Sequence, residues 1–66
     1  MKNKRQKKIL EIITAKDVET QEELQLLLAE EGFTAAQPTV SRDIQELRLV
    51  KAVNDEGKYR YIQSGN

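Results

Sequence analysis

Hydrogen-bonding side chains gather between positions 37 and 45 of this sequence, at Gln37, Thr39, Ser41, Arg42 and Gln45. A guanidinium can donate two hydrogen bonds to guanine, an amide can pair with adenine, and a hydroxyl can reach a base or a phosphate. If these residues share one helix, its exposed face has the chemistry to read base edges in a DNA groove. An ordinary solvated helix carries similar polar residues, so the surrounding elements decide what the pattern means.

The apolar spacing of the same stretch predicts that helix. Val40, Ile44 and Leu47 follow one another at i, i+4 and i+7, which is typical of a buried stripe on a helix over residues 38–48. Pro38 suits the first turn, where its missing N–H is not needed. With this stripe buried, the polar residues named above lie on the outward face and its flanks.

Two carboxylates on the same helix fit a DNA-facing role poorly, because phosphate repels them. Asp43 lies next to the buried stripe, so we expect it to be structural and paired with a Lys or Arg of the first helix. Glu46 lies beside the outward face, where its charge limits affinity for DNA.

Two further helices are predicted upstream, over residues 4–14 and 21–31. Their apolar stripes are Ile9, Ile12 and Ile13 in the first and Leu24, Leu27 and Leu28 in the second. Thr20 and Glu23 form the signature of a capping box, in which each side chain binds a free backbone N–H of the helix start. Gly32 suits the left-handed position beyond the helix end.

The last third of the chain predicts a β-hairpin. Residues 49–53 and 58–62 are rich in β-branched and aromatic side chains, and the turn-forming residues 54–57 separate them. Alternation along the second strand places Tyr59 and Tyr61 toward the core. The polar tail, residues 63–66, is expected to fray.

The order of helix, helix, turn, helix and hairpin predicts a single domain over residues 1–66. Its class is mainly α with a small β hairpin, a winged helix-turn-helix of three helices and a two-stranded antiparallel wing, since a lone hairpin must pack on helices for stability. In this architecture the third helix enters a DNA groove.

Composition excludes several function classes. The chain has no Cys and no His, so it offers neither a thiol nucleophile nor an imidazole base, and no Cys or His set for a metal. We therefore expect no enzyme activity and no metal. No stretch approaches the roughly 20 apolar residues of a membrane helix, and no signal-peptide core is present. We expect a cytoplasmic protein with no membrane partner.

The formal net charge of zero hides an uneven distribution. Residues 2–16 contain six Lys or Arg and one Glu, whereas residues 17–31 contain six carboxylates and no Lys or Arg. Salt screens charges beyond about 10 Å, so the local sign matters more to a phosphate than the total does. Neutrality therefore does not exclude DNA as a partner.

Phosphate contacts are expected at the edges of the interface, from Lys7, Lys8, Thr20, Gln21, Lys58 and Arg60. Each has an alternative role. The basic N-terminal cluster, which comprises Lys2, Lys4, Arg5, Lys7 and Lys8, could follow a DNA backbone or form a solvated terminus. Thr20 and Gln21 suit plain helix capping, which we favour, and the hairpin cations suit protection of exposed strand edges.

The sequence Gln-Pro-Thr-Val-Ser-Arg-Asp-Ile-Gln-Glu-Leu at residues 37–47 resembles the recognition-helix signature of bacterial arginine repressors. Thr-Gln-Glu-Glu-Leu at residues 20–24 and Gly-Lys-Tyr-Arg-Tyr at residues 57–61 match the same family. The resemblance covers nearly the whole chain. One departure is Pro38, where the family commonly has Ala, because proline removes an N–H that a phosphate could meet.

This resemblance implies a winged helix-turn-helix that contacts operator DNA through Gln37, Thr39, Ser41 and Arg42. It implies a full-length repressor of arginine biosynthesis and catabolism genes, with L-arginine as co-repressor and a C-terminal domain that binds arginine and builds a homo-hexamer. Since this chain stops at Asn66, we expect that C-terminal domain to be absent from it. The 66 residues then hold no cofactor, and the isolated domain is expected to be a monomer.

A different class of function remains open from the residues alone. The acidic second helix could make a winged-helix module that binds another protein instead of DNA. Salt-dependent operator binding distinguishes the two.

Overall fold

The computed structural model describes residues 3–64, and Lys2 of the basic N-terminal cluster lies outside that range. Its elements, in chain order, are α1 (Lys4–Ala15), α2 (Gln21–Glu30), α3 (Gln37–Glu46), β1 (Leu49–Val53) and β2 (Tyr59–Gln63). The strands pair antiparallel, from Leu49 opposite Gln63 to Val53 opposite Tyr59. Three helices plus this hairpin confirm the predicted winged helix-turn-helix.

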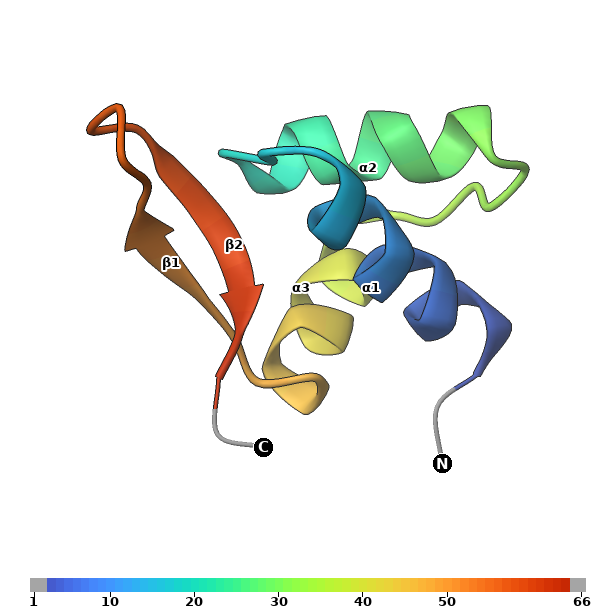
Figure 1. The fold of residues 1–66 in the computed structure, drawn as a ribbon. Helices are drawn as coiled ribbons and strands as arrows, with labels where there is room; N and C mark the ends of the chain where they lie inside the picture. The colour runs from blue at the N-terminus through green and yellow to red at the C-terminus, as the bar shows by residue number, and fades with distance from the viewer. Residues whose placement is uncertain (1–2, 65–66) are drawn as a thin grey trace.

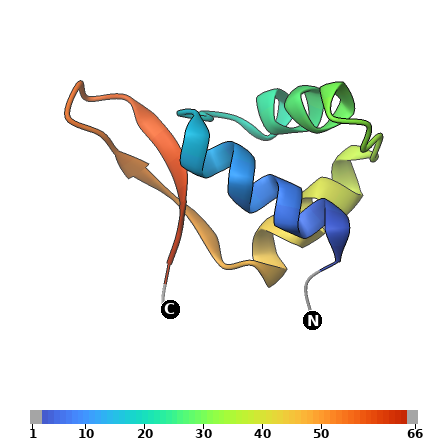
Figure 2. The ribbon, with the colours of Figure 1, turned by 45° about the vertical axis from the view of Figure 1, so that its right-hand side comes forward.

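The three helices form one cluster, and the hairpin extends along one side of it (Figure 1). The turned view shows the hairpin tip projecting away from the helices (Figure 2). Among the described residues, no helix combines the length and the apolar character needed to cross a membrane.

α1 begins as predicted and ends one residue later, at Ala15. Its start carries a capping box that we did not predict. The Asn3 side chain accepts a hydrogen bond from the backbone N–H of Gln6 at 2.7 Å, and the Gln6 side chain accepts one from the Asn3 N–H at 3.4 Å. This reciprocal pair fixes the first turn of the helix.

α2 begins at the predicted residue and ends at Glu30, one residue early. The Thr20 hydroxyl caps it by accepting from the Glu23 N–H at 3.1 Å. The second half of the expected capping box is wrong, because the Glu23 carboxylate accepts from the Glu19 N–H at 3.0 Å and not from Thr20. Gly32 follows with φ of +90°, as its predicted position requires.

α3 begins one residue before the predicted start and ends at Glu46, two residues early. The early end has a backbone cause: Arg48 has φ of +58°, in the left-handed region that stops a helix. Its N–H donates to the Gln45 carbonyl at 3.1 Å and closes the last turn. The chain then reverses directly into β1.

The predicted fraying of the tail is wrong for residues 63 and 64. Gln63 is the last residue of β2, and Ser64 donates to the Arg48 carbonyl both from its N–H and from its hydroxyl, each at 2.9 Å. Gly65 and Asn66 lie outside the described residues.

The core lies between the helices and the inner face of the hairpin. Its fully buried aliphatic members are Ile9, Val18, Leu24, Leu28 and Val40. Tyr61 is buried as predicted, but Tyr59 is 56% exposed, which corrects the prediction that both rings face the core. Alternation gives the two rings the same face, yet Tyr59 pairs with Val53 at the end of the strands, beyond the helices.

Candidate nucleic-acid interface

The five predicted base-reading residues all lie on α3. Gln37, Arg42 and Gln45 are exposed, and Thr39 and Ser41 are half-buried. Gln37, Ser41 and Gln45 follow at i, i+4 and i+8 and so form one stripe, with Arg42 beside it. Within residues 3–64, no side-chain hydrogen bond or ion pair engages any of the five, so their donors and acceptors are available to a ligand.

α3 is held from its other side by a buried polar network. Asp43 is only 1% exposed and accepts hydrogen bonds from Arg5, through Nε and, at 3.0 Å, through Nη2. Gln6, 5% exposed, donates from Nε2 to Asp43 Oδ1 at 3.0 Å and to Glu46 Oε1 at 2.8 Å. The predicted pairing of Asp43 with a basic residue of the first helix is therefore confirmed, with Arg5 as the partner.

The electrostatics of this network favour its charged form. Burial alone would raise the pKa of Asp43, but hydrogen bonds from Arg5 and Gln6, with the charges of Arg5 and Arg42, hold it below its usual value. The hydrogen bond to Asp43 raises the pKa of Arg5 against the opposing effect of burial, and the charges of Asp43 and Glu46 add to the rise. The ion pair therefore stays intact across neutral pH.

The turn that presents α3 is also fixed by a side chain. Gln25 of α2 donates from Nε2 to the Ala35 carbonyl at 2.8 Å, which ties α2 to the segment before α3. Ala36 caps α3 without a side-chain hydrogen bond, and Pro38 lies in the first turn as predicted.

The predicted phosphate contacts of α1 differ in their surroundings. Lys7 is exposed, whereas the Lys8 ammonium lies 3.0 Å from the Glu11 carboxylate and 3.5 Å from that of Glu31. The hydrogen bond to Glu11 raises the pKa of Lys8, and the charge of Glu11 adds to it. Lys8 thus faces the acidic end of α2 and not α3.

The start of α2 serves its own helix. The Thr20 hydroxyl is occupied by the cap, and Gln21 is half-buried. Glu19, Glu22 and Glu23 surround this end of the helix. Their charges oppose the binding of a phosphate here, which favours the capping role.

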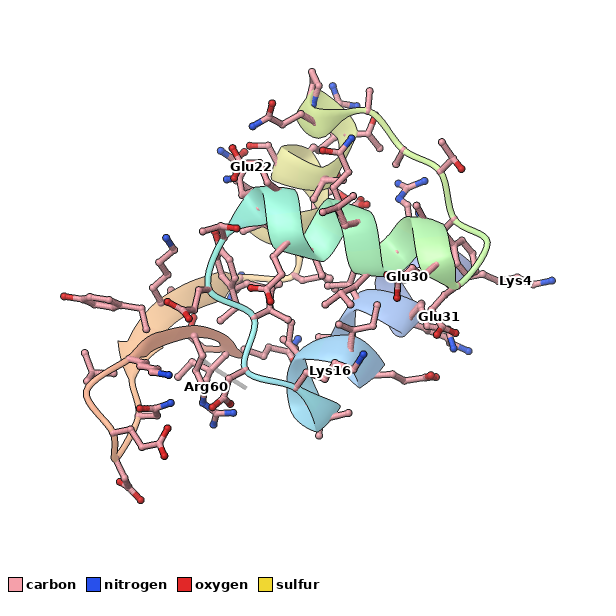
Figure 3. All side chains as sticks on the ribbon, turned by 90° about the horizontal axis from the view of Figure 1, so that it is seen from above. Lys4, Lys16, Glu22, Glu30, Glu31 and Arg60 are labelled. Carbon is pink, nitrogen blue, oxygen red and sulfur yellow. The ribbon has the colours of Figure 1, made fainter. Side chains whose placement is uncertain are left out.

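On the hairpin, Lys58 and Arg60 also differ. Lys58 is exposed, whereas Arg60 Nη1 lies 3.4 Å from Asp17 Oδ1. Asn54 Nδ2 donates to the other oxygen of Asp17 at 3.0 Å, so this carboxylate binds the hairpin to the segment after α1. Figure 3 shows Arg60 on the same side of the molecule as Lys16, with Glu22 at one end of α2 and Glu30 and Glu31 at the other.

A polar hollow of about 330 Å³ opens between the first turn of α1 and the side of α3. It is lined by Asn3, which caps α1, by Arg5 of α1, and by Pro38, Thr39, Arg42, Asp43 and Glu46 of α3. Two predicted base-reading residues therefore share a surface with Arg5. The sequence placed Arg5 only within the basic N-terminal cluster and assigned neither Asn3 nor Gln6 to this region. Contacts that cross from one helix to another leave no spacing pattern in the sequence.

Comparison with known proteins gives one consistent family. The family model described as arginine repressor, DNA binding domain, matches residues 1–64. An arginine repressor of Caldicellulosiruptor saccharolyticus is 59% identical over 61 residues, which cover 92% of this chain and 40% of the relative. One of Alkaliphilus oremlandii is 56% identical over 92% of this chain and 41% of its own length. An arginine repressor of Thermoanaerobacter sp. strain X514 is 53% identical over 98% of this chain and 44% of its own length.

Proposed function

Because the chain belongs to the family of arginine repressor DNA-binding domains, we propose that it binds operator DNA with α3 in the major groove. The family is one of transcriptional regulators and not of enzymes. The observation that carries the proposal is the exposed side of α3. Five hydrogen-bonding side chains stand there without partners among the described residues, while the buried Asp43 network holds the helix from behind.

The roles within α3 follow from position. Ser41 and Arg42 make the central contacts, with the guanidinium suited to the O6 and N7 atoms of guanine. The flanking contacts come from Gln37, Thr39 and Gln45. Their hydroxyl and amide groups reach bases or the neighbouring sugar–phosphate backbone of the DNA.

Phosphate contacts surround this centre. Of the six candidates, Lys7 and Lys58 are exposed cations outside any ion pair among residues 3–64, so they suit the role best. Lys8 and Arg60 must give up carboxylate partners to bind a phosphate, and Thr20 and Gln21 must overcome the acidic residues beside them. We therefore rank Lys7 and Lys58 first.

The chain spans 40% to 44% of the length of the relatives described above. We propose that the remaining part of such a protein binds L-arginine as co-repressor and assembles a hexamer, in the cytoplasm. Linked copies of the domain then bind an operator more tightly than one copy does, because the second contact becomes intramolecular. The regulated genes are those of arginine biosynthesis and catabolism.

The test is binding of this domain to a duplex from the promoter of its host's arginine biosynthesis genes, with a scrambled duplex of equal composition as control. We expect preference for the promoter duplex and a linear fall of log affinity with log salt concentration. Equal binding to both duplexes contradicts sequence-specific recognition. The alternative of a protein-binding module on the acidic α2 is not favoured, since the family is one of DNA-binding domains.

A further inference from the structure

We propose that the hollow between α1 and α3 is a binding site for one phosphodiester of the operator backbone, with Arg5 as its main donor. This inference rests on the proposed function, because it needs α3 to lie in the groove. Arg5 belongs to the basic N-terminal cluster but is not among the six predicted phosphate contacts, and the hollow gives it a defined site.

The geometry of Arg5 leaves part of its guanidinium available. Nε and Nη2 bind the two oxygens of Asp43, while Nη1 has no hydrogen-bond partner among residues 3–64. In the same range, every fully buried side-chain nitrogen or oxygen has a partner, so Nη1 must be accessible to solvent. The side chain of Arg5 is 28% exposed, and Arg5 lines the hollow.

The Asp43 carboxylate also prepares Arg5 for this role. A side chain of Arg normally loses much rotamer freedom when it binds a ligand, and this loss weakens binding. Here two hydrogen bonds to a buried carboxylate already hold the planar group in place. The exposed lysines of α1 have no such support among the described residues.

The position of the hollow matches the expected path of the DNA backbone. Thr39 and Arg42 line the hollow together with Arg5. A base contact by Arg42 therefore brings the sugar–phosphate backbone of the DNA to this edge of α3. The first turn of α1 also begins at the hollow, with Asn3 as its cap. The partial positive charge of a helix start adds to the attraction of an anion.

The charges that face the site include two carboxylates. Asp43 is compensated by Arg5 and Gln6, which bind its oxygens. Glu46 accepts one hydrogen bond from Gln6 and contributes a negative charge at the rim. We expect this charge to weaken phosphate binding.

The main experiment compares the domain with the double variant Arg5→Met, Asp43→Leu. Replacing both partners removes the guanidinium without leaving a buried charge behind, which preserves the fold better than either single change. We expect affinity for the operator to fall by about tenfold, as for loss of one charge-assisted hydrogen bond. The slope of log affinity against log salt should decrease by about 0.9, the value for one phosphate contact.

The matched control is Lys16→Gln, which removes one positive charge at the other end of α1. Its affinity should stay within about twofold of the original and its salt slope unchanged, because screening limits distant charges. Ethylation interference separates a contact in the hollow from a general movement of α3, because loss of the hollow contact changes the effect of one phosphate whereas a rotated helix changes the effect of many. One ethylated phosphate should block binding of the original domain and have no further effect on the double variant.

A second variant keeps the inference testable if the double variant does not fold. Glu46→Gln leaves the Arg5–Asp43 pair intact and removes the rim charge. We expect it to tighten binding about twofold to threefold, equally on operator and scrambled DNA. Unchanged affinity in this variant overturns the proposed site.

The outcomes separate this inference from the proposed function. If the original domain prefers the operator and the folded double variant keeps its affinity and salt slope, the hollow is not a phosphate site although α3 still reads DNA. If the domain binds all DNA equally and the salt slope of the double variant is smaller by about 0.9, the hollow is supported and sequence-specific reading is not. Absence of any DNA binding at low salt overturns both.

Discussion

Arg42 carries the largest share of the expected base recognition, because it is exposed at the centre of the outward face of α3 and makes no ion pair among the described residues. Arg42→Ala should weaken operator binding by about 1–3 kcal/mol and relax the preference for one base pair. Fluorescence anisotropy on a set of single-base operator variants measures both effects. A folded variant with unchanged affinity and preference contradicts the assignment.

Asp43 is expected to make stability depend on acid. Its folded-state pKa lies below its usual value, and the unfolded value is about 4. The carboxylate therefore contributes stability above that unfolded value, and this contribution is lost as the pH falls through the folded pKa. We expect the difference in free energy of unfolding between the original domain and Asp43→Asn to shrink as the pH falls below about 4, the unfolded value, and on through the lower folded-state pKa of Asp43.

Urea titrations at several pH values test this expectation. If the two proteins differ by the same free energy of unfolding at every acid pH, the charged carboxylate does not have this role. The loss of stability in acid follows from the lowered pKa of Asp43. A raised pKa would instead have made acid increase the free energy of unfolding.

At the residue scale, sequence reasoning located the polar face of α3 and a basic partner for Asp43. It could not choose Arg5 from the five cations between Lys2 and Lys8, because one helical register leaves several within reach of the facing helix. Gln6 was missed altogether. An amide within a basic cluster gives no spacing signal, and its burial depends on where α3 packs.

At the scale of elements, the end of α3 offers a direct test of backbone strain. Arg48 has φ of +58°, a conformation that costs a residue with a side chain roughly 1–2 kcal/mol. Arg48→Gly should raise the free energy of unfolding by up to about 1 kcal/mol, since glycine adopts this conformation freely but loses more entropy on folding. Thermal denaturation measures the change.

Arg48→Ala is the control. Alanine keeps the backbone strain at this positive φ and, like glycine, lacks the arginine side chain. It should show no gain in stability. A gain of equal size in both variants means that removal of the arginine side chain, and not the backbone conformation, is responsible.

The helices and strands themselves were predictable within one or two residues, because their apolar residues repeat at 3.6 and 2. The end of α3 was misplaced since nothing in an Arg-Leu pair signals a left-handed residue, whereas Gly32 did signal one. Val18 was also missed as a core residue. It lies in the connection after α1, outside any helical stripe, and is buried because β2 packs beside it, with the Tyr61 N–H donating to its carbonyl at 2.9 Å.

At the scale of the molecule, the hairpin is expected to add affinity without sequence preference. Lys58 is exposed beside the turn of the hairpin. Lys58→Ala should weaken binding equally on operator and scrambled duplexes and reduce the salt slope by about 0.9. A loss confined to the operator means that Lys58 reads bases or DNA shape instead of contacting phosphate.

The overall architecture could be predicted because composition leaves few alternatives. Without Cys or His, the fold depends on packed aliphatic side chains, and three amphipathic helices with one hairpin have few ways to bury them together. The surroundings of the candidate phosphate-binding residues could not be predicted in the same way. Lys8 and Arg60 find carboxylates of distant segments, Glu31 and Asp17, and only the folded chain brings these pairs together.

The Asp43 network also has a consequence for the rotation of α3 about its own axis. Aliphatic side chains pack acceptably over a range of rotations, whereas paired hydrogen bonds from Arg5 and Gln6 to one carboxylate accept a narrow range. A step of one residue along a helix corresponds to about 100° of rotation, so a modest turn of α3 would move Arg42 away from the base that we propose it contacts. On the proposed role of α3, the buried carboxylate sets the angle at which the helix meets DNA, and substitutions there should alter which bases are read before they abolish binding.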